Sequence, residues 1–119
     1  MQIEPNHPGE HIVSEANGMR SRESDTLAEG QNLQAGTVLG RITSTGLLTQ
    51  LAPAAETGEE EAVGVLFAAV DASDADTSCV VHVRDCEVDD QDLVWPEGIS
   101  GPNKETAVGE LLALGIIVR

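Results

Sequence analysis

Three side chains that can bind zinc lie close together in this 119-residue sequence: Cys79, His82 and Cys86. Valines flank His82 and predict a strand over 78–84, with Val81 and Val83 on one face and His82 and Arg84 on the other. Cys79 and His82 would then point to opposite faces of that strand. No second Cys-x-x-Cys or His-x-x-x-His pair completes a four-ligand site. We therefore predict no metal site and interpret both cysteines as buried or half-buried thiols.

Two other groups of titratable residues have weaker spacing. His7 and His11 are four residues apart, but Pro8 and Gly9 between them disfavour a shared helical face. The acidic segment 71–77, DASDADT, lacks the glycine and the distal glutamate of an EF-hand calcium loop. We interpret it as a solvated hairpin tip, with weak surface binding of a cation as the alternative.

No arrangement of residues in the sequence indicates catalysis. The motifs G-x-S-x-G and H-E-x-x-H and a glycine-rich phosphate loop are all absent. The segment 36–40, GTVLG, has two glycines but no following Lys-Ser/Thr pair, so it predicts a turn and a strand. Lipoyl and biotinyl carrier domains need a lysine on a hairpin, whereas the single lysine, Lys104, opens a predicted helix. We expect a protein that is not an enzyme and uses no cofactor.

Composition and charge narrow the choice of partners. The net charge is −15, from 21 acidic and 6 basic residues. Nucleic acids and anionic membranes both bind through Lys and Arg, so neither is an expected partner. Aromatic residues make up only 2% of the chain, so the core must be built from Val, Leu, Ile and Ala. The N-terminus lacks the basic and apolar regions of a signal peptide, so we expect synthesis in a cytoplasm and reduced thiols.

The order of the elements predicts an α+β fold, a β-rich small domain with one C-terminal helix and an extended N-terminal arm. Residues 1–25 have only scattered apolar positions and read as the arm, and 26–119 form the domain. Glycine turns and β-branched residues predict the strands, and apolar spacing after a Ser-Gly-Pro cap predicts the helix. The expected strands are 33–43, 62–70, 78–84 and 116–118, residues 47–51 lead on from a turn at 44–46, and the helix is 104–114.

The segment 91–99, QDLVWPEGI, contains the only tryptophan. A ligand platform would need further aromatic residues nearby, and Pro96 favours rigid extended backbone over a hinge. We predict that Leu93, Trp95 and Pro96 pack into the core or into a subunit interface.

The ordered series of segments resembles a known family, the bacteriophage head decoration proteins of the lambda type. The matching stretches are SEANGMRSRES (14–24), LAEGQNLQAGTVLGRIT (27–43), AVGVLFAAVDAS (62–73), VRDCEVDDQDLVWPEGIS (83–100) and LLALGIIVR (111–119). The resemblance implies a β-rich homotrimer, without catalytic activity, on the outer surface of an icosahedral head. There it would bind the major capsid protein at local three-fold positions and stabilise the shell against the pressure of the packaged DNA.

The same resemblance implies that the N-terminal arm becomes ordered on the capsid. Arg20 and Arg22 would pair with capsid carboxylates or remain solvated charges, and an apolar arm would gain a surface by adding a strand to a capsid-protein sheet. The alternative from another class is a carbohydrate- or metal-binding accessory display module. The expected capsid-binding residues of the arm are Ile3, Pro5, Ile12, Val13, Glu15, Arg20 and Arg22.

Overall fold

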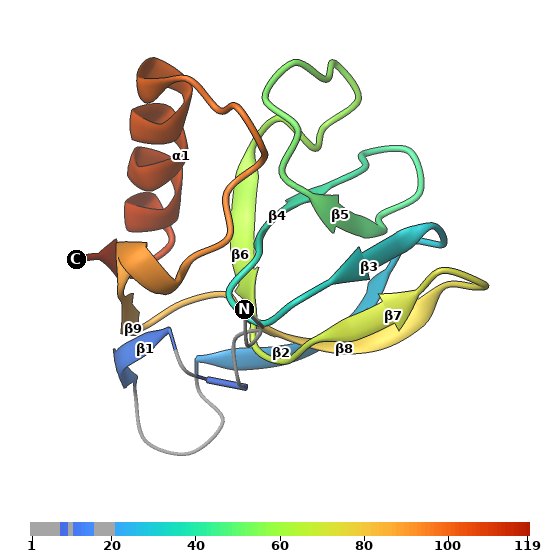
Figure 1. Cartoon of the computed structure of the whole chain (residues 1–119), viewed down its shortest axis with the longest axis horizontal. Coiled ribbons are helices and arrows are strands. Elements are labelled where there is room, and N and C mark those ends of the chain that lie inside the picture. The colour runs from blue at the N-terminus through green and yellow to red at the C-terminus, as the bar shows by residue number, and fades with distance from the viewer. Residues whose placement is uncertain (1–7, 10, 16–20) are drawn as a thin grey trace, which may run out of the picture.

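The computed structural model describes residues 8–9, 11–15 and 21–119. This part of the chain is rich in short strands and carries one α-helix near the C-terminus, which confirms the predicted fold class (Figure 1). In chain order the elements are β1 (Ile12–Glu15), β2 (Arg22–Leu27), β3 (Gln31–Leu33), β4 (Val38–Arg41), β5 (Leu48–Gln50), β6 (Ala62–Leu66), β7 (Val70–Ala72), β8 (Thr77–His82), β9 (Cys86–Val88), the 3₁₀ turn η1 (Asp90–Asp92), α1 (Gly101–Ala113) and β10 (Ile116–Val118).

Five strands close into a barrel in the order β2-β5-β4-β6-β8. Strands β2 and β8 pair in antiparallel register along their full lengths, from Arg22 opposite His82 to Leu27 opposite Thr77. Aliphatic side chains fill the barrel, as the shortage of aromatic residues requires. Its most buried members are Leu27, Leu39, Leu48, Leu66 and Val81. Strands β3 and β7 form a separate two-stranded ribbon at the side of the barrel (Figure 1).

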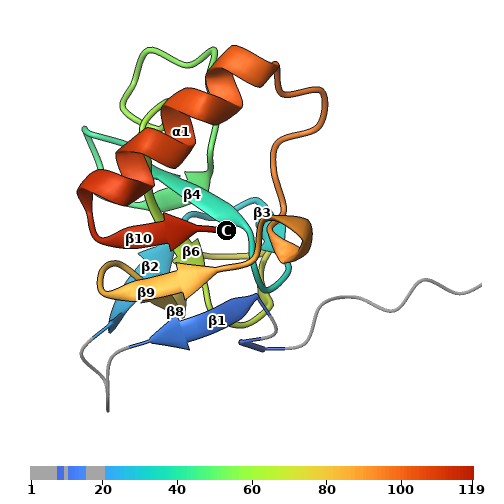
Figure 2. The same cartoon turned by 90° about the vertical axis from the view of Figure 1, so that its left-hand side faces the viewer.

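A second, smaller sheet has the order β1-β9-β10 and lies next to α1 (Figure 2). Strand β9 pairs antiparallel with β1 and parallel with β10. One face of the sheet contributes Cys86, Val88 and Ile116 to a core that also receives Ala107 and Leu111 from the helix. The two cores share the barrel wall, because Val38 and Val65 belong to the second core while their strands belong to the barrel.

The helix begins and ends with ordinary capping chemistry. Ser100 is the N-cap, and its hydroxyl oxygen accepts a hydrogen bond of 3.2 Å from the backbone N–H of Asn103. Gly115 follows the C-cap with φ of 91°, a left-handed conformation that glycine adopts without steric cost. The chain can therefore reverse directly from α1 into β10. Within the described ranges, α1 is the longest helix, and no helix is long and apolar enough to cross a bilayer.

Glycine is also required where two segments of backbone meet at the barrel wall. A Cβ atom on Gly40 would lie 2.3 Å from the carbonyl oxygen of Glu59, and one on Gly64 would lie 2.8 Å from that of His82. Both distances are far below a normal van der Waals contact. Gly40 and Gly64 thus serve close packing of the barrel.

The described N-terminal residues, those of β1 and β2, are part of the folded domain. Strand β1 is hydrogen-bonded to β9, and the predicted boundary between arm and domain, residue 25, falls inside β2 of the barrel. Two apolar or β-branched residues, Ile12 and Val13, are too few to predict a strand locally, and β1 forms because β9 supplies its hydrogen-bonding partner. The predicted arm residues Ile3, Pro5 and Arg20 lie outside the described residues.

Candidate functional site

A group of polar side chains lies where β1 meets the barrel. The Glu15 carboxylate, at the end of β1, accepts hydrogen bonds from the Ser21 hydroxyl at 2.5 Å and from Arg22 Nε at 3.2 Å. Arg22 also donates from its terminal nitrogen to the second Glu15 oxygen. The ring nitrogen Nε2 of His82, on β8, lies 2.9 Å from Glu15 Oε2. One carboxylate therefore joins β1 to β2 and β8.

Rings and backbone bury the histidine side of this polar group, while Glu15 and Arg22 stay partly exposed. His82 and His11 are both fully buried, and their ring centres are 5.6 Å apart in an edge-on arrangement. The Phe67 ring lies 5.4 Å from that of His82, and the Arg22 guanidinium stacks over Phe67 at 4.1 Å. The backbone N–H of Gly9 donates to the Phe67 carbonyl at 3.0 Å, which holds the start of the segment over the barrel.

Neighbouring groups shift the pKa values of both Glu15 and His82. The hydrogen bond from Arg22 is the main cause that lowers the pKa of Glu15 to about 2, with Ser21 and His82 contributing and partial burial opposing. Burial lowers the pKa of His82 below its ordinary value, and the hydrogen bond to Glu15 opposes that shift. At neutral pH the site therefore holds an ionised carboxylate beside a neutral imidazole.

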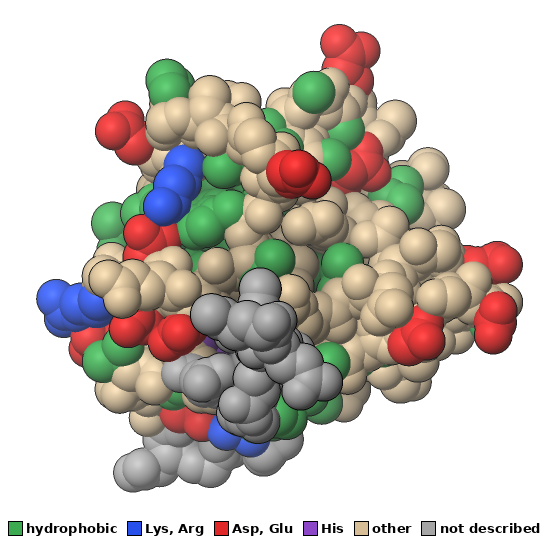
Figure 3. All heavy atoms as spheres, viewed as in Figure 1, with side chains coloured by type: hydrophobic (Ala, Val, Ile, Leu, Met, Phe, Trp, Pro, Cys, Tyr) green, Lys and Arg blue, Asp and Glu red, His purple; other side chains and the backbone are tan. Residues whose placement is uncertain are grey.

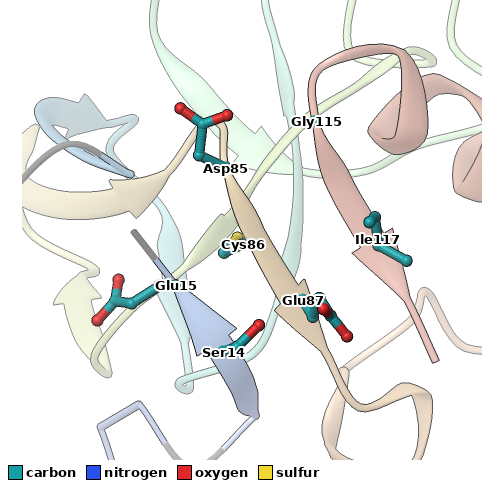
Figure 4. A pocket seen from close by; sticks show the side chains of 7 residues that line it. All are labelled: Ser14, Glu15, Asp85, Cys86, Glu87, Gly115 and Ile117. Carbon is teal, nitrogen blue, oxygen red and sulfur yellow. The ribbon is translucent and has the colours of Figure 1, made fainter. Parts of the chain in front are cut away.

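The outer face of the β1-β9-β10 sheet forms an open depression of about 450 Å³. Figure 4 shows the three strands side by side, and the strand registers place Ser14 and Ile117 on either side of Glu87. Arg119 pairs with Glu87 at 2.6 Å, so the acidic character of this face is partly neutralised.

Exposed large apolar side chains of the described residues come from β1 and from the corner between α1 and β10. They are Val13 at 54% exposure, Leu112 at 59%, Leu114 at 41% and Ile117 at 37%. Figure 3 shows apolar side chains exposed on the helix side of the molecule, with acidic and basic side chains among them. Exposed apolar groups that lie near one another mark surfaces that bind other proteins.

A comparison with protein-family models decides the family. The model of the bacteriophage lambda head decoration protein D matches residues 1–116. The chain belongs to this family. Its members are structural proteins associated with the phage capsid, and a search of curated proteins finds no match to the chain.

The residues of the N-terminal arm that were expected to bind the capsid have different surroundings in the structure. Val13 is exposed on β1, and Ile12 is half-buried against the second core. Glu15 and Arg22 pair with each other, so Arg22 already has a carboxylate partner within the chain. Capsid contact by these residues stays a prediction.

In this head decoration protein Trp95 lies beside the helix. Leu93 is 7% exposed in the second core, Trp95 is half-buried against that core, and Pro96 follows it, also half-buried. Trp95 Nε1 donates to Asp90 Oδ1 at 2.9 Å, and Lys104 Nζ donates to the other oxygen of Asp90 at 3.0 Å. These contacts connect η1 to the first turn of α1. A role of this cluster in a subunit interface stays a prediction.

The two cysteines lie in different cores and do not form a site with His82. Cys79 belongs to the barrel core and Cys86 to the second core, and both are buried free thiols. Burial raises the pKa of each thiol to about 11, so both stay protonated at neutral pH. Among the described residues, no three His, Cys, Asp or Glu side chains are grouped to hold a metal ion.

Sequence reasoning missed the contact of His82 with Glu15. The two residues are 67 positions apart, and no local pattern relates them. The one available signal was a histidine inside a run of valines, on the strand face opposite Val81 and Val83.

Proposed function

We propose that this protein decorates the outer surface of an icosahedral phage capsid as a homotrimer and stabilises the shell against the pressure of the packaged DNA. The observation that carries the proposal is the match to the head decoration family over residues 1–116. The partner is the major capsid protein. A net charge of −15 fits a position outside the shell, because such a protein is not attracted to the packaged DNA.

The N-terminal part of the chain is the proposed capsid contact. Among the described residues, strand β1 is at an edge of its sheet and pairs with β9 on one side. An edge strand presents backbone N–H and C=O groups to a further strand, and Val13 beside that edge offers apolar surface. These features support docking of a capsid-protein strand along β1.

Trimer formation would let modest contacts produce firm attachment. Three N-terminal segments held in one assembly bind a three-fold position together, because the first contact raises the effective concentration of the other two. Each subunit then needs only a small capsid-binding surface, such as β1 with the residues before it.

The central test is the binding of the purified protein to expanded, empty heads of its own phage, measured by electron microscopy and by the temperature of shell disruption. We expect stoichiometric addition of trimers and a higher disruption temperature. Folded protein that leaves the heads bare would overturn the proposal.

Two variants test the N-terminal contact. A deletion of residues 2–7 removes only residues that precede the described fold, and Val13→Ser removes the exposed apolar group of β1; both are expected to lower head occupancy. Leu112→Ser, used after sedimentation has shown that it self-associates like the natural protein, is the matched control, since Leu112 is similarly exposed but lies on α1. Equal losses with Val13→Ser and Leu112→Ser would contradict the assignment of the contact to β1.

A further inference from the structure

The segment 11–15 is held by backbone hydrogen bonds, by apolar packing of Ile12 and by a charged side chain, Glu15. Two backbone bonds attach the chain at and just before the start of the segment, from Gly9 N–H to the Phe67 carbonyl and from Asp89 N–H to the His11 carbonyl. Beyond His11, β1 makes a short, irregular pairing with β9, with a register shift between Ile12 and Ser14. At the end of the segment the Glu15 carboxylate binds Arg22 and His82.

The hydrogen bond between His82 and Glu15 assigns the proton on the imidazole. Glu15 is ionised above about pH 2 and accepts, so Nε2 of neutral His82 carries the proton. The other nitrogen, Nδ1, is buried and has no hydrogen-bond partner among the described residues. A second proton there would place an N–H donor, and a positive charge, in a buried site that offers no acceptor from the described chain.

The elements packed against His82 determine whether its ring is neutral or protonated. Burial disfavours the charged ring, Glu15 on β1 favours it, and Arg22 on β2 disfavours it. The buried His11 ring lies edge-on to that of His82, with the ring centres 5.6 Å apart. The neighbouring strand β6 places Val65 opposite His82, and Phe67 beyond that strand lies against its ring. Arg22 already occupies Glu15, so the single carboxylate cannot fully neutralise a second cation.

We propose that His82 and Glu15 form a proton-operated latch, which holds residues 11–15 on the barrel at neutral pH and loosens them on acidification. Protonated His82 is better solvated when β1 lifts and water reaches the ring. The lowered pKa of His82 supports the direction: the closed state loses stability as the pH falls below about 6.5, the ordinary value for histidine. One proton taken up on opening raises the opening constant by up to about tenfold for each pH unit in that window.

The latch would control how readily β1 reaches another protein. That consequence rests on the proposed function, since β1 is the proposed capsid contact. The latch itself is a property of the isolated chain and is tested without capsids, so the failure of either proposal can be told from the failure of the other.

Hydrogen exchange of the isolated protein between about pH 7.5 and pH 5 provides the test, with each rate corrected for the intrinsic pH dependence of exchange. Protection of the amides of residues 12–15 is expected to fall as the pH drops below 6.5, by up to about tenfold for each pH unit, while the amides of β6 keep theirs. The matched variant is His82→Gln, because the glutamine amide can still donate to Glu15 but does not titrate. We expect its β1 protection to stay constant.

Constant protection of β1 in the natural protein, or an equal loss in His82→Gln, would overturn the proposal. If His82→Gln fails to fold, a second measurement on the natural protein still tests the proposal. Nuclear magnetic resonance of the His82 ring should show titration below pH 6.5, and titration at or above that value would also overturn the latch.

Discussion

At the scale of single residues, the chain concentrates its polar interactions on a few buried or half-buried carboxylates. Glu15 and Asp90 each bind two or more donors from different elements, Glu15 joining β1 to the barrel and Asp90 joining η1 to α1. A carboxylate that binds a cation and a neutral donor together is sensitive to the loss of its charge. Substitutions of Glu15 and of Trp95, which donates to Asp90, test how much these two carboxylates contribute to stability.

Replacing Glu15 by Gln should remove a contribution of about 3 kcal/mol to the free energy of unfolding at pH 7. The pKa of Glu15 falls from 4.5 to about 2 on folding, so this contribution is present above pH 4.5 and is lost as the pH falls toward 2. Urea unfolding at several pH values should show the natural protein and the variant converging in acid. Glu23→Gln is the control, because the Glu23–Arg84 pair is exposed and should contribute little.

Two substitutions of Trp95 should separate the contribution of its packing to stability from that of its hydrogen bond. Trp95→Phe loses the bond to Asp90 and should cost about 1 kcal/mol, whereas Trp95→Ala also loses the packing against the second core and should cost about 3 kcal/mol. Denaturant unfolding measures both values. An alanine variant as stable as the natural protein would show that Trp95 does not pack the monomer, and sedimentation would then report whether it packs a subunit interface.

At the scale of elements, glycine positions distinguish close packing from simple flexibility. Gly109 is in α1, and among the described residues no atom outside the neighbouring helix backbone lies within 4 Å of the position of a Cβ there. Gly64 in β6 is different, because a Cβ would lie 2.7 Å from a Val81 methyl carbon and close to the backbone of His82. The same residue type therefore has opposite roles in the two elements.

Gly109→Ala should stabilise the protein by about 0.5–1 kcal/mol, since alanine restricts the unfolded chain and favours helix. Gly64→Ala should destabilise it by about 1–3 kcal/mol, because the barrel wall has to move apart. Thermal unfolding should show melting temperatures shifted in opposite directions from the natural protein. A lower melting temperature for Gly109→Ala would indicate that α1 is packed against another subunit at this position.

At the scale of the whole molecule, acidic charge opposes apolar association. The net charge of −15 repels other copies of the chain, while the exposed apolar groups at β1 and at the α1–β10 corner favour contact. The balance between the two depends on salt, because screening shortens the range of the repulsion.

Self-association should therefore strengthen as salt rises from about 50 mM to about 500 mM, since the Debye length falls from roughly 14 Å to roughly 4 Å. Analytical ultracentrifugation of the isolated protein measures the trimer fraction directly. Leu112→Ser and Ile117→Ser show which exposed apolar side chain contributes. A trimer fraction that decreases with salt would mean that ion pairs, and not apolar contacts, hold the subunits together.

The sequence by itself determined the features that local chemistry controls. The aliphatic core follows from the lack of aromatic residues, and the Ser-Gly-Pro cap with its apolar spacing predicted a helix at 104–114, which the structure extends to Gly101–Ala113. The final strand at 116–118 also agrees. The ordered series of segments led to the decoration family that the family model then matched.

Only the tertiary structure decided which short strands pair and which polar groups meet. Most of these strands are three to six residues long, so their side-chain pattern is too short to specify a partner, and closure of the barrel depends on residues far apart in the chain. Residues 12–15 read as part of an unsupported arm because their partner, β9, comes more than 70 positions later. The contact of His82 with Glu15 has the same origin, since burial and distance, not residue order, bring the imidazole and the carboxylate together.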